Sequence, residues 1–214
     1  MNIWRIETHC HTNISPCATL KPQKLINLAK KLGIKALVIT DHDNIEAALH
    51  IRKIAPFFVI IGQEISTKDG EVLGYFLSER VPPGLSVEQT IELIREQKGL
   101  VGIPHPFDPF RKNRLHVEKL EEILTMVDCL EVWNARNIFV SSNEKAERMA
   151  EKHGILKIAG SDAHTSFEVG RSGMFTTPFS NANEFLESLR TGSLIKQKSP
   201  MWVHGITKIK KTLI

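Results

Sequence analysis

Histidines and carboxylates gather in five short clusters of this 214-residue sequence. In chain order the clusters are His9-Cys10-His11, Asp41-His42-Asp43, Gln63-Glu64, Pro104-His105-Pro106 and Ser161-Asp162-Ala163-His164. Imidazole together with carboxylate suits Zn, Mn or Fe, whereas Ca and Mg prefer shells made of oxygen alone. A carboxylate such as Glu64 can bridge two ions. The clusters therefore predict a polynuclear metal site.

The spacing within two clusters supports this prediction. Successive side chains of an extended chain alternate between two faces, so His9 and His11 can point the same way, as can Asp162 and His164. Either motif alone is a weak pattern, and five clusters in one chain favour a metal site. The remaining histidines lie in helical or tail segments, where we expect surface or packing roles: His50, His116, His153 and His204.

A short apolar run comes before each of the five clusters. We expect strands over residues 3–8, 36–40, 57–62, 100–103, 129–133 and 156–159, and helices over 20–33, 86–99, 117–127 and 142–154. Pro22 suits the first turn of a helix and Gly33 its end, while Ser86 and Gln89 are spaced for a capping box. Residues 68–77 interrupt the alternation and are expected to add a hairpin strand. The tail over 202–214 is compatible with a strand, a helix or a cap.

Strands that alternate with helices predict parallel βαβ units, in a barrel or in a large doubly wound sheet. In a βα barrel the loops at the carboxyl ends of the strands meet at one mouth. All five clusters follow or end a predicted strand, and a sixth strand carries Glu131 and Asn134. The arrangement places the ligand candidates at that mouth.

Composition limits the class of protein. Hydrophobic residues make up 42% and charged residues 24% of the chain, and no apolar run approaches the roughly 20 residues of a membrane span. We expect one domain over residues 1–214, in the cytoplasm, because the start lacks the order of a secretory signal and Cys10, Cys17 and Cys129 form no paired framework. The net charge of +4 is a mild bias, compatible with an anionic substrate or with a solvated basic surface.

The five clusters, in this order and at these intervals, resemble the PHP family, the polymerase and histidinol phosphatase superfamily of metal-dependent phosphoesterases. The resemblance extends over nearly the whole chain. It implies an α/β fold, a distorted (β/α)7 TIM-like barrel, with two or three divalent ions at the carboxyl ends of the strands.

The resemblance also implies a ligand set. One ion would lie among His9, His11, Glu64 and Asp162, a second would be shared by Glu64 and His105, and a third would bind His42 and His164. Family members often place Asp or His a few residues after the first motif, where this chain has Ser15-Pro16-Cys17, so Cys17 is either a thiolate ligand or a bystander. The second ion lacks an obvious further ligand. Glu131 is our candidate, and its alternative role is to orient His105 or a water.

Phosphoester hydrolysis by a metal-activated water needs no protein nucleophile. We expect Asp41 to orient an imidazole rather than to act as a base, and the leaving group to be protonated by His164 or by a water. Arg136 and Arg171 are candidate phosphate anchors, with surface salt bridges as the alternative. Four further positive residues either extend the positive rim of the phosphate site or belong to a solvated loop: Lys68, Arg111, Lys112 and Arg114. Phe107 and Trp133 either stack on a base or pack in the core.

A small phosphomonoester or a nucleotide is the leading substrate, because the chain shows no recognisable nucleic-acid module. An exonuclease acting on short oligonucleotides is the close alternative. A non-catalytic scaffold with a PHP-like fold and a metal-dependent amidohydrolase are further alternatives. The sequence predicts no oligomeric state.

Overall fold

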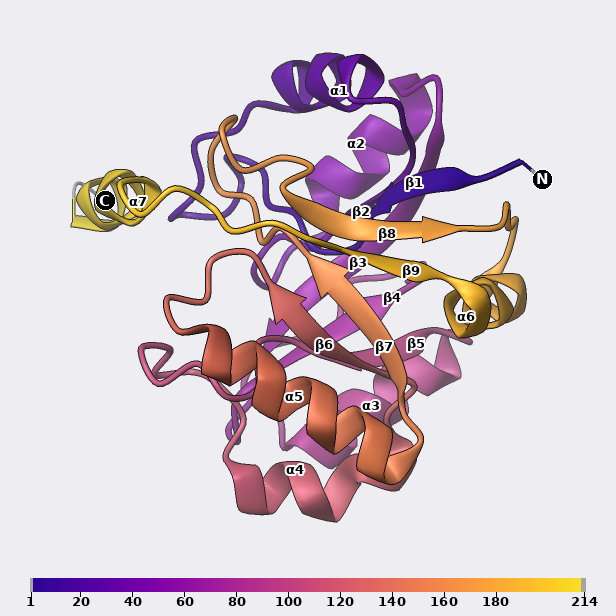
Figure 1. Cartoon of the computed structure of the whole chain (residues 1–214), viewed down its shortest axis with the longest axis vertical. Helices are drawn as coiled ribbons and strands as arrows, with labels where there is room; N and C mark the ends of the chain where they lie inside the picture. The colour runs from indigo at the N-terminus through magenta and orange to yellow at the C-terminus, as the bar shows by residue number, and fades with distance from the viewer. Residues whose placement is uncertain (1, 213–214) are drawn as a thin grey trace.

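A computed structural model describes residues 2–212 and places nine strands in one sheet of order β7-β6-β5-β4-β3-β2-β1-β8-β9 (Figure 1). The strands are β1 (Trp4–Glu7), β2 (Ile34–Ile39), β3 (Phe58–Ser66), β4 (Glu71–Tyr75), β5 (Leu100–Ile103), β6 (Cys129–Asn134), β7 (Leu156–Gly160), β8 (Ser172–Thr176) and β9 (Ser193–Lys196). The helices are α1 (Pro22–Lys31), α2 (Glu46–Ile54), α3 (Val87–Glu96), α4 (Val117–Ile123), the short 3-10 helix η1 (Leu124–Met126), α5 (Val140–His153), α6 (Ala182–Thr191) and α7 (Val203–Thr212).

The six expected strands run parallel to one another as β1, β2, β3, β5, β6 and β7. The hairpin strand expected after Glu64 is β4, which lies antiparallel between β3 and β5. Four elements were not expected from the sequence: α2, α6, β8 and β9. The two missed strands have only five and four residues, and β9 is half-exposed, so neither shows a strong apolar run.

The sheet curves into a nearly closed barrel. β7 lies beside β8 without a hydrogen-bonded ladder along most of its length. At the carboxyl ends of the strands, however, an isolated parallel bridge joins Cys10 to Ala163, with the amide of His11 donating to the carbonyl of Ala163 at 2.9 Å. The barrel class is as expected, but the seven-unit repeat is not reproduced, because β4 and β8 run against the parallel strands.

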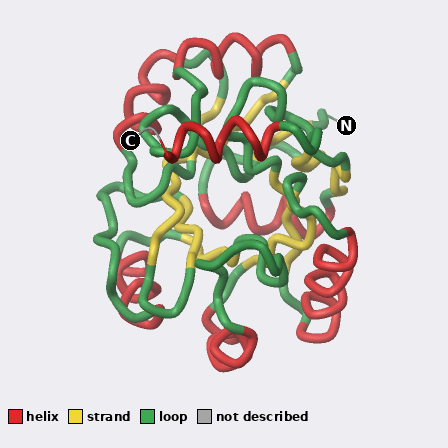
Figure 2. Tube along the Cα trace, turned by 90° about the vertical axis from the view of Figure 1, so that its left-hand side faces the viewer, coloured by secondary structure: helices red, strands yellow, loops and turns green. Residues whose placement is uncertain are grey.

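The two faces of the strands form two apolar clusters, as the period of two requires. One face carries Ile6, Val38, Ile60, Leu73, Cys129 and Ile158, which pack together with Phe185 of α6 inside the barrel. The other face carries Leu37, Ile61, Val101 and Leu130, which pack with residues of the surrounding helices. Figure 2 shows the helices arranged around the strands. α6 lies at the end of the barrel opposite to α7 (Figure 1), and its Phe185 and Leu189 are buried in the inner cluster.

The predicted helix signals are present. Pro22 lies in the first turn of α1, and Gly33, which follows the end of the helix, adopts a left-handed φ of 69°. Ser86 and Gln89 form the capping box of α3. The tail forms α7, one of the alternatives left open. None of the helices formed by residues 2–212 is long and apolar enough to cross a membrane.

We expect Ser86→Ala to lower the free energy of unfolding by about 1 kcal/mol, because the amide of Gln89 loses its acceptor. In a chain of this size that corresponds to a fall in Tm of about 2–4 °C. Thermal unfolding followed by circular dichroism measures the change. Ser141→Ala on the exposed start of α5, a helix whose N-cap residue makes no side-chain capping bond, is the control and should leave Tm unchanged.

Candidate metal centre

The alternation that builds the barrel core also positions the carboxylates. On β3 the inward series Ile60, Gly62 and Glu64 turns from apolar to acidic toward the carboxyl end of the strand. The series Ile158, Gly160 and Asp162 does the same at the end of β7. The inward face is therefore apolar in the middle of the barrel and acidic at its mouth.

Four side-chain atoms converge at this mouth. His9 Nε2 and His11 Nε2 lie 3.1 Å apart. Glu64 Oε2 lies 3.5 Å from His9 Nε2 and 3.2 Å from His11 Nε2. Asp162 Oδ1 lies 3.6 and 3.3 Å from the same two nitrogens. All four residues are fully buried.

This arrangement fits a divalent ion. Glu64 Oε2 and Asp162 Oδ1 are buried and have no hydrogen-bond partner among the described residues. A tetrahedral ion with bonds of about 2.0–2.2 Å separates its ligand atoms by about 3.3–3.6 Å, close to the distances observed. The expected first ligand set is thus brought together with unused lone pairs.

The electrostatics of the cluster require positive charge. Burial alone would lower the pKa of His11, but the carboxylates of Asp162 and Glu64 outweigh burial and raise the pKa to about 9. Burial alone would raise the pKa of Glu64, yet the imidazoles of His42 and His9 hold the pKa well below its usual range. A divalent cation bound to the two imidazoles would supply the positive charge that these buried carboxylates require.

His105 and Glu71 extend the cluster on the far side of Glu64. His105 Nε2 lies 2.9 Å from Glu64 Oε1 and 3.8 Å from Glu71 Oε2. Glu71, which lies on β4 opposite Ser66 of β3, was not among the ligand candidates expected from the sequence. A signal for it was present in the sequence. Glu71, Leu73 and Tyr75 are every second residue of the predicted hairpin strand and so share one face, and in an antiparallel strand the first of them lies at the mouth.

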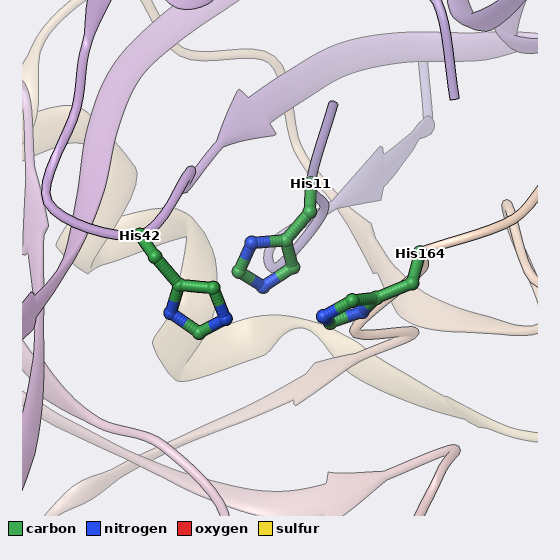
Figure 3. Close-up of side chains that lie close together, drawn as sticks. All are labelled: His11, His42 and His164. Atoms are coloured by element: carbon green, nitrogen blue, oxygen red, sulfur yellow. The ribbon is translucent and has the colours of Figure 1, made fainter. Parts of the chain in front are cut away.

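Three histidines form a further group, drawn in Figure 3: His11, His42 and His164. One ring nitrogen from each lies within 4.8 Å of the others. The Nδ1 of His164 lies 2.8 Å from the carbonyl oxygen of Asp162, and a carbonyl only accepts, so Nδ1 carries the proton. Burial, followed by the charge of His11, lowers the pKa of His164 well below its usual range, which leaves a neutral ring whose Nε2 is a lone-pair donor.

Asp41 holds the loop that follows His11. Its carboxylate accepts from the amide and the hydroxyl of Thr12, at 2.7 Å each, and from the hydroxyl of Ser15. Ser15 Oγ lies 3.3 Å from His11 Nδ1 and accepts from the amide of His42 at 3.0 Å. Asp41 thus acts on His11 through Ser15, as expected of an orienting carboxylate.

Glu131 orients a histidine in this structure. Its carboxylate lies 3.0 Å from Nδ1 of His9 and accepts from the amide of His105 at 2.8 Å and from the side chain of Asn134 at 2.9 Å. Nδ1 of His9 is the donor, so its Nε2 lone pair faces the cluster. The Glu131 carboxylate is occupied by three donors, which favours an orienting role over that of a ligand, but the imidazole that it orients is that of His9 and not, as the alternative had it, that of His105.

Two residues of the cluster have left-handed backbones. The φ angles are 29° at His105 and 51° at Asp162. Side chains other than glycine rarely adopt this region, at a cost of roughly 1–3 kcal/mol per residue. Backbone contacts hold both residues there: the amide of His105 donates to Glu131, and the amide of Asp162 donates to the carbonyl of His9.

A pocket of about 580 Å³ opens above the histidines. It is lined by His42, Glu71 and His164, by Asp108 and residues 110–113 of one loop, by Arg136 and Ile138, and by His204, Thr207 and Lys208 of α7. Arg136 therefore lies at the site. Arg171 does not: it lines a separate depression with Arg5 and Lys31, and its Nε donates to the carbonyl of Phe167.

Three other residues near the pocket had alternative roles in the sequence. Arg111, for which a solvated loop was an alternative, donates to Asp162 through Nη2 and lies 3.5 Å from Asp108 through Nε. His204, expected at the surface or in packing, is half-buried and lines the pocket. Phe107 packs against the apolar core, and it is Phe110 that reaches the pocket.

Comparisons with known proteins agree with this geometry. A family model described as PHP domain matches residues 7–103, and one described as PHP-associated matches residues 140–194. An uncharacterized protein of Methanocaldococcus jannaschii is 34% identical over 213 residues, covering 91% of this chain and 84% of that protein. This chain belongs to the PHP family.

Two further proteins are similar to this PHP chain, one in sequence and one in structure. A probable phosphatase of Caldicellulosiruptor bescii is 25% identical over 201 residues, covering 78% of this chain and 82% of that protein. A crystal structure of a two-domain protein of Bacteroides vulgatus, which contains a predicted PHP-like metal-dependent phosphoesterase, matches with a TM-score of 0.73 at 16% identity. The match covers 92% of this chain and 65% of that one, and it shows the fold.

We expect Glu64→Gln to lower the metal content of the PHP chain, because an amide offers one neutral oxygen where the carboxylate offers two charged ones. Metal per chain, measured by plasma mass spectrometry on freshly purified protein, should fall by at least half while the circular dichroism spectrum is retained. Glu144→Gln on the exposed face of α5 is the matched control. Full metal content in the Glu64 variant would refute the assignment of Glu64.

We expect Cys17 to react slowly with iodoacetamide in metal-free protein. Burial, followed by the charges of Asp162 and Glu64, raises the pKa of its thiol to about 11, and Cys10 and Cys129 are fully buried. At pH 8 the thiolate is then roughly 100-fold scarcer than for an ordinary cysteine, and the rate should rise up to pH 11. Peptide mass spectrometry of timed samples measures the rate. A plateau below pH 9 is the contrary outcome.

Proposed function

We propose that this chain is a metal-dependent phosphoesterase that hydrolyses a small phosphomonoester or a nucleotide with water as the nucleophile. One observation carries the proposal: two buried carboxylate oxygens and two imidazole nitrogens converge, with the oxygens unsatisfied, beside a pocket lined by cations. The family and the probable phosphatase of Caldicellulosiruptor bescii support hydrolysis of phosphoesters in general.

The residues fall into ligands and orienting groups. We assign His9, His11, Glu64 and Asp162 to one ion, Glu64, Glu71 and His105 to a second, and His42 and His164 to a third where three are bound. Divalent ions held there would lower the pKa of a water and neutralise the phosphoryl oxygens. Zn, Mn and Fe all suit this donor set.

The protein's own groups bind and orient the substrate. Arg136 is buried at the pocket, and its Nη1, which is ion-paired with Glu168 at 3.3 Å, can also donate to a phosphoryl oxygen. Arg111 lies against Asp162 and adds positive charge at the same end of the pocket. His164 keeps its proton on Nδ1, toward the Asp162 carbonyl, which supports a ligand role and leaves protonation of the leaving group to water.

The pocket also supports a small substrate. Its volume of about 580 Å³ lies within the range of roughly 300–1,000 Å³ that is typical of small-molecule sites. A pocket of this size favours a phosphomonoester or a nucleotide over an oligonucleotide. Retention of the complete buried cluster argues against a scaffold without catalysis.

The proposal is tested by phosphate release from a panel of phosphomonoesters, nucleotides and short oligonucleotides, before and after chelation and after Mn or Zn is restored. We expect release from the small esters that is lost on chelation and recovered with metal. Arg136→Gln should raise KM about tenfold or more, because a charge-assisted contact is lost, whereas Arg171→Gln should leave KM unchanged. Metal-loaded protein that releases no phosphate from any ester would refute the function.

A further inference from the structure

The lining of the pocket has two origins. Its floor, which we define as His42, Ser66, Glu71 and His164, comes from the segments that the two family models match. Its wall, which we define as Asp108, residues 110–113, Arg136, Ile138 and the pocket-lining residues of α7, comes from residues 104–139 and 195–214, outside both matched segments. The floor carries three of the assigned ligands, His42, Glu71 and His164, so the wall is where this chain's own selectivity would reside.

Helix α7 lies on the ligand side of the barrel. In Figure 1 it is on the side toward which the arrowheads of β6 and β7 point, and in Figure 2 it crosses the near face. Its first residue, Val203, is fully buried. Near its other end, Lys210 donates to the carbonyl of Ala18, in the loop that follows His11. The helix is thus attached to the rest of the molecule near both of its ends.

The central contact of α7 is with Arg136. Nη2 of Arg136 donates to the hydroxyl of Thr207 at 3.0 Å, and both side chains are buried. Nη1 forms a buried ion pair with Glu168 Oε1 at 3.3 Å, although neither atom has a hydrogen-bond partner among residues 2–212. The hydrogen-bonding capacity of Nη1 is thus not fully used, and a phosphoryl oxygen in the pocket would supply an acceptor.

We propose that α7 is part of the substrate site, with Thr207 as a positioning residue for Arg136 and with His204 and Lys208 facing the leaving group. The inference rests on the proposed function and deepens it. A phosphoryl group bound at the floor must direct its ester oxygen toward the open side of the pocket, where α7 and Phe110 form the wall. The leaving groups accepted are then those that fit between a polar helix face and an exposed aromatic ring.

The positioning role is tested by titrating inorganic phosphate into the full-length, metal-loaded protein in a calorimeter. Thr207→Val keeps the shape of the side chain and removes the acceptor of Arg136, so phosphate should bind about five- to tenfold more weakly. Thr207→Ser restores a hydroxyl and should bind within about twofold of the wild type. Thr191→Val, at an exposed threonine of α6, is the matched control. Equal affinity in Thr207→Val and Thr207→Ser would overturn the role of Thr207.

Contact with the leaving group is tested with two esters, methyl phosphate and adenosine 5′-monophosphate. His204→Ala should lower kcat/KM for the nucleotide about fivefold or more and change that for methyl phosphate less than twofold, while His153→Ala at the exposed end of α5 changes neither. An equal loss for both esters would overturn the contact.

The two proposals fail in different ways. Protein that binds phosphate and shows the expected difference between Thr207→Val and Thr207→Ser, yet hydrolyses neither ester, would refute the proposed function and support the positioning role. Binding of the nucleotide, measured in the same calorimeter, then replaces turnover as the readout for His204. Wild-type protein that binds no phosphate would overturn the role of α7.

Discussion

Two carboxylates, Glu64 and Asp162, share one buried imidazole nitrogen, and much of the site is arranged around that fact. Each lies within 3.3 Å of His11 Nε2, at a position with no access to water. Charge of one sign at this density is tolerated only when opposite charge is close. His9, Arg111 and the ions that the PHP family binds are alternative sources of that positive charge.

Closure of the barrel brings these groups together. The first motif and the last are more than 150 residues apart in the chain, and β8 separates their strands along most of the sheet. The bridge between Cys10 and Ala163, together with the bond from the amide of Asp162 to the carbonyl of His9, joins them at the mouth. Thr8 adds a side-chain bond to the carbonyl of Ala159 at 2.8 Å. A change that opened this seam would separate the ligands without removing any of them.

Sequence reasoning reached the strands and the central ligand candidates because both follow local rules. Apolar runs located six strands, and the carboxyl-end rule for parallel strands placed His9, His42 and Asp162 at one mouth. The same reasoning missed Glu71, since that rule does not apply to an antiparallel strand, whose first residue lies at the mouth. Arg171 was placed at the mouth because it follows the last motif, but the direction of a loop side chain is set by tertiary contacts, and it points elsewhere.

The contacts of α7 with the rest of the chain could not be predicted from the sequence. Its sequence has no acidic first turn, and nothing local ties it to residues 15–18 or to Arg136. Such a contact depends on how the whole barrel closes. The missed α2 is similar, because its N-cap residue, Ile45, offers no capping side chain and the helix is held by packing of Ala47, Ala48 and Ile51.

The left-handed backbones of His105 and Asp162 connect the site to the folding equilibrium. Glycine or asparagine would hold these conformations at lower cost, but neither offers the imidazole or the carboxylate at that point in the cluster. The polypeptide is therefore less stable than its topology would permit, and an ion that binds only the folded chain offsets the deficit in proportion to the logarithm of its concentration. For a chain that binds such an ion, the supply of metal would then set how long the folded protein persists.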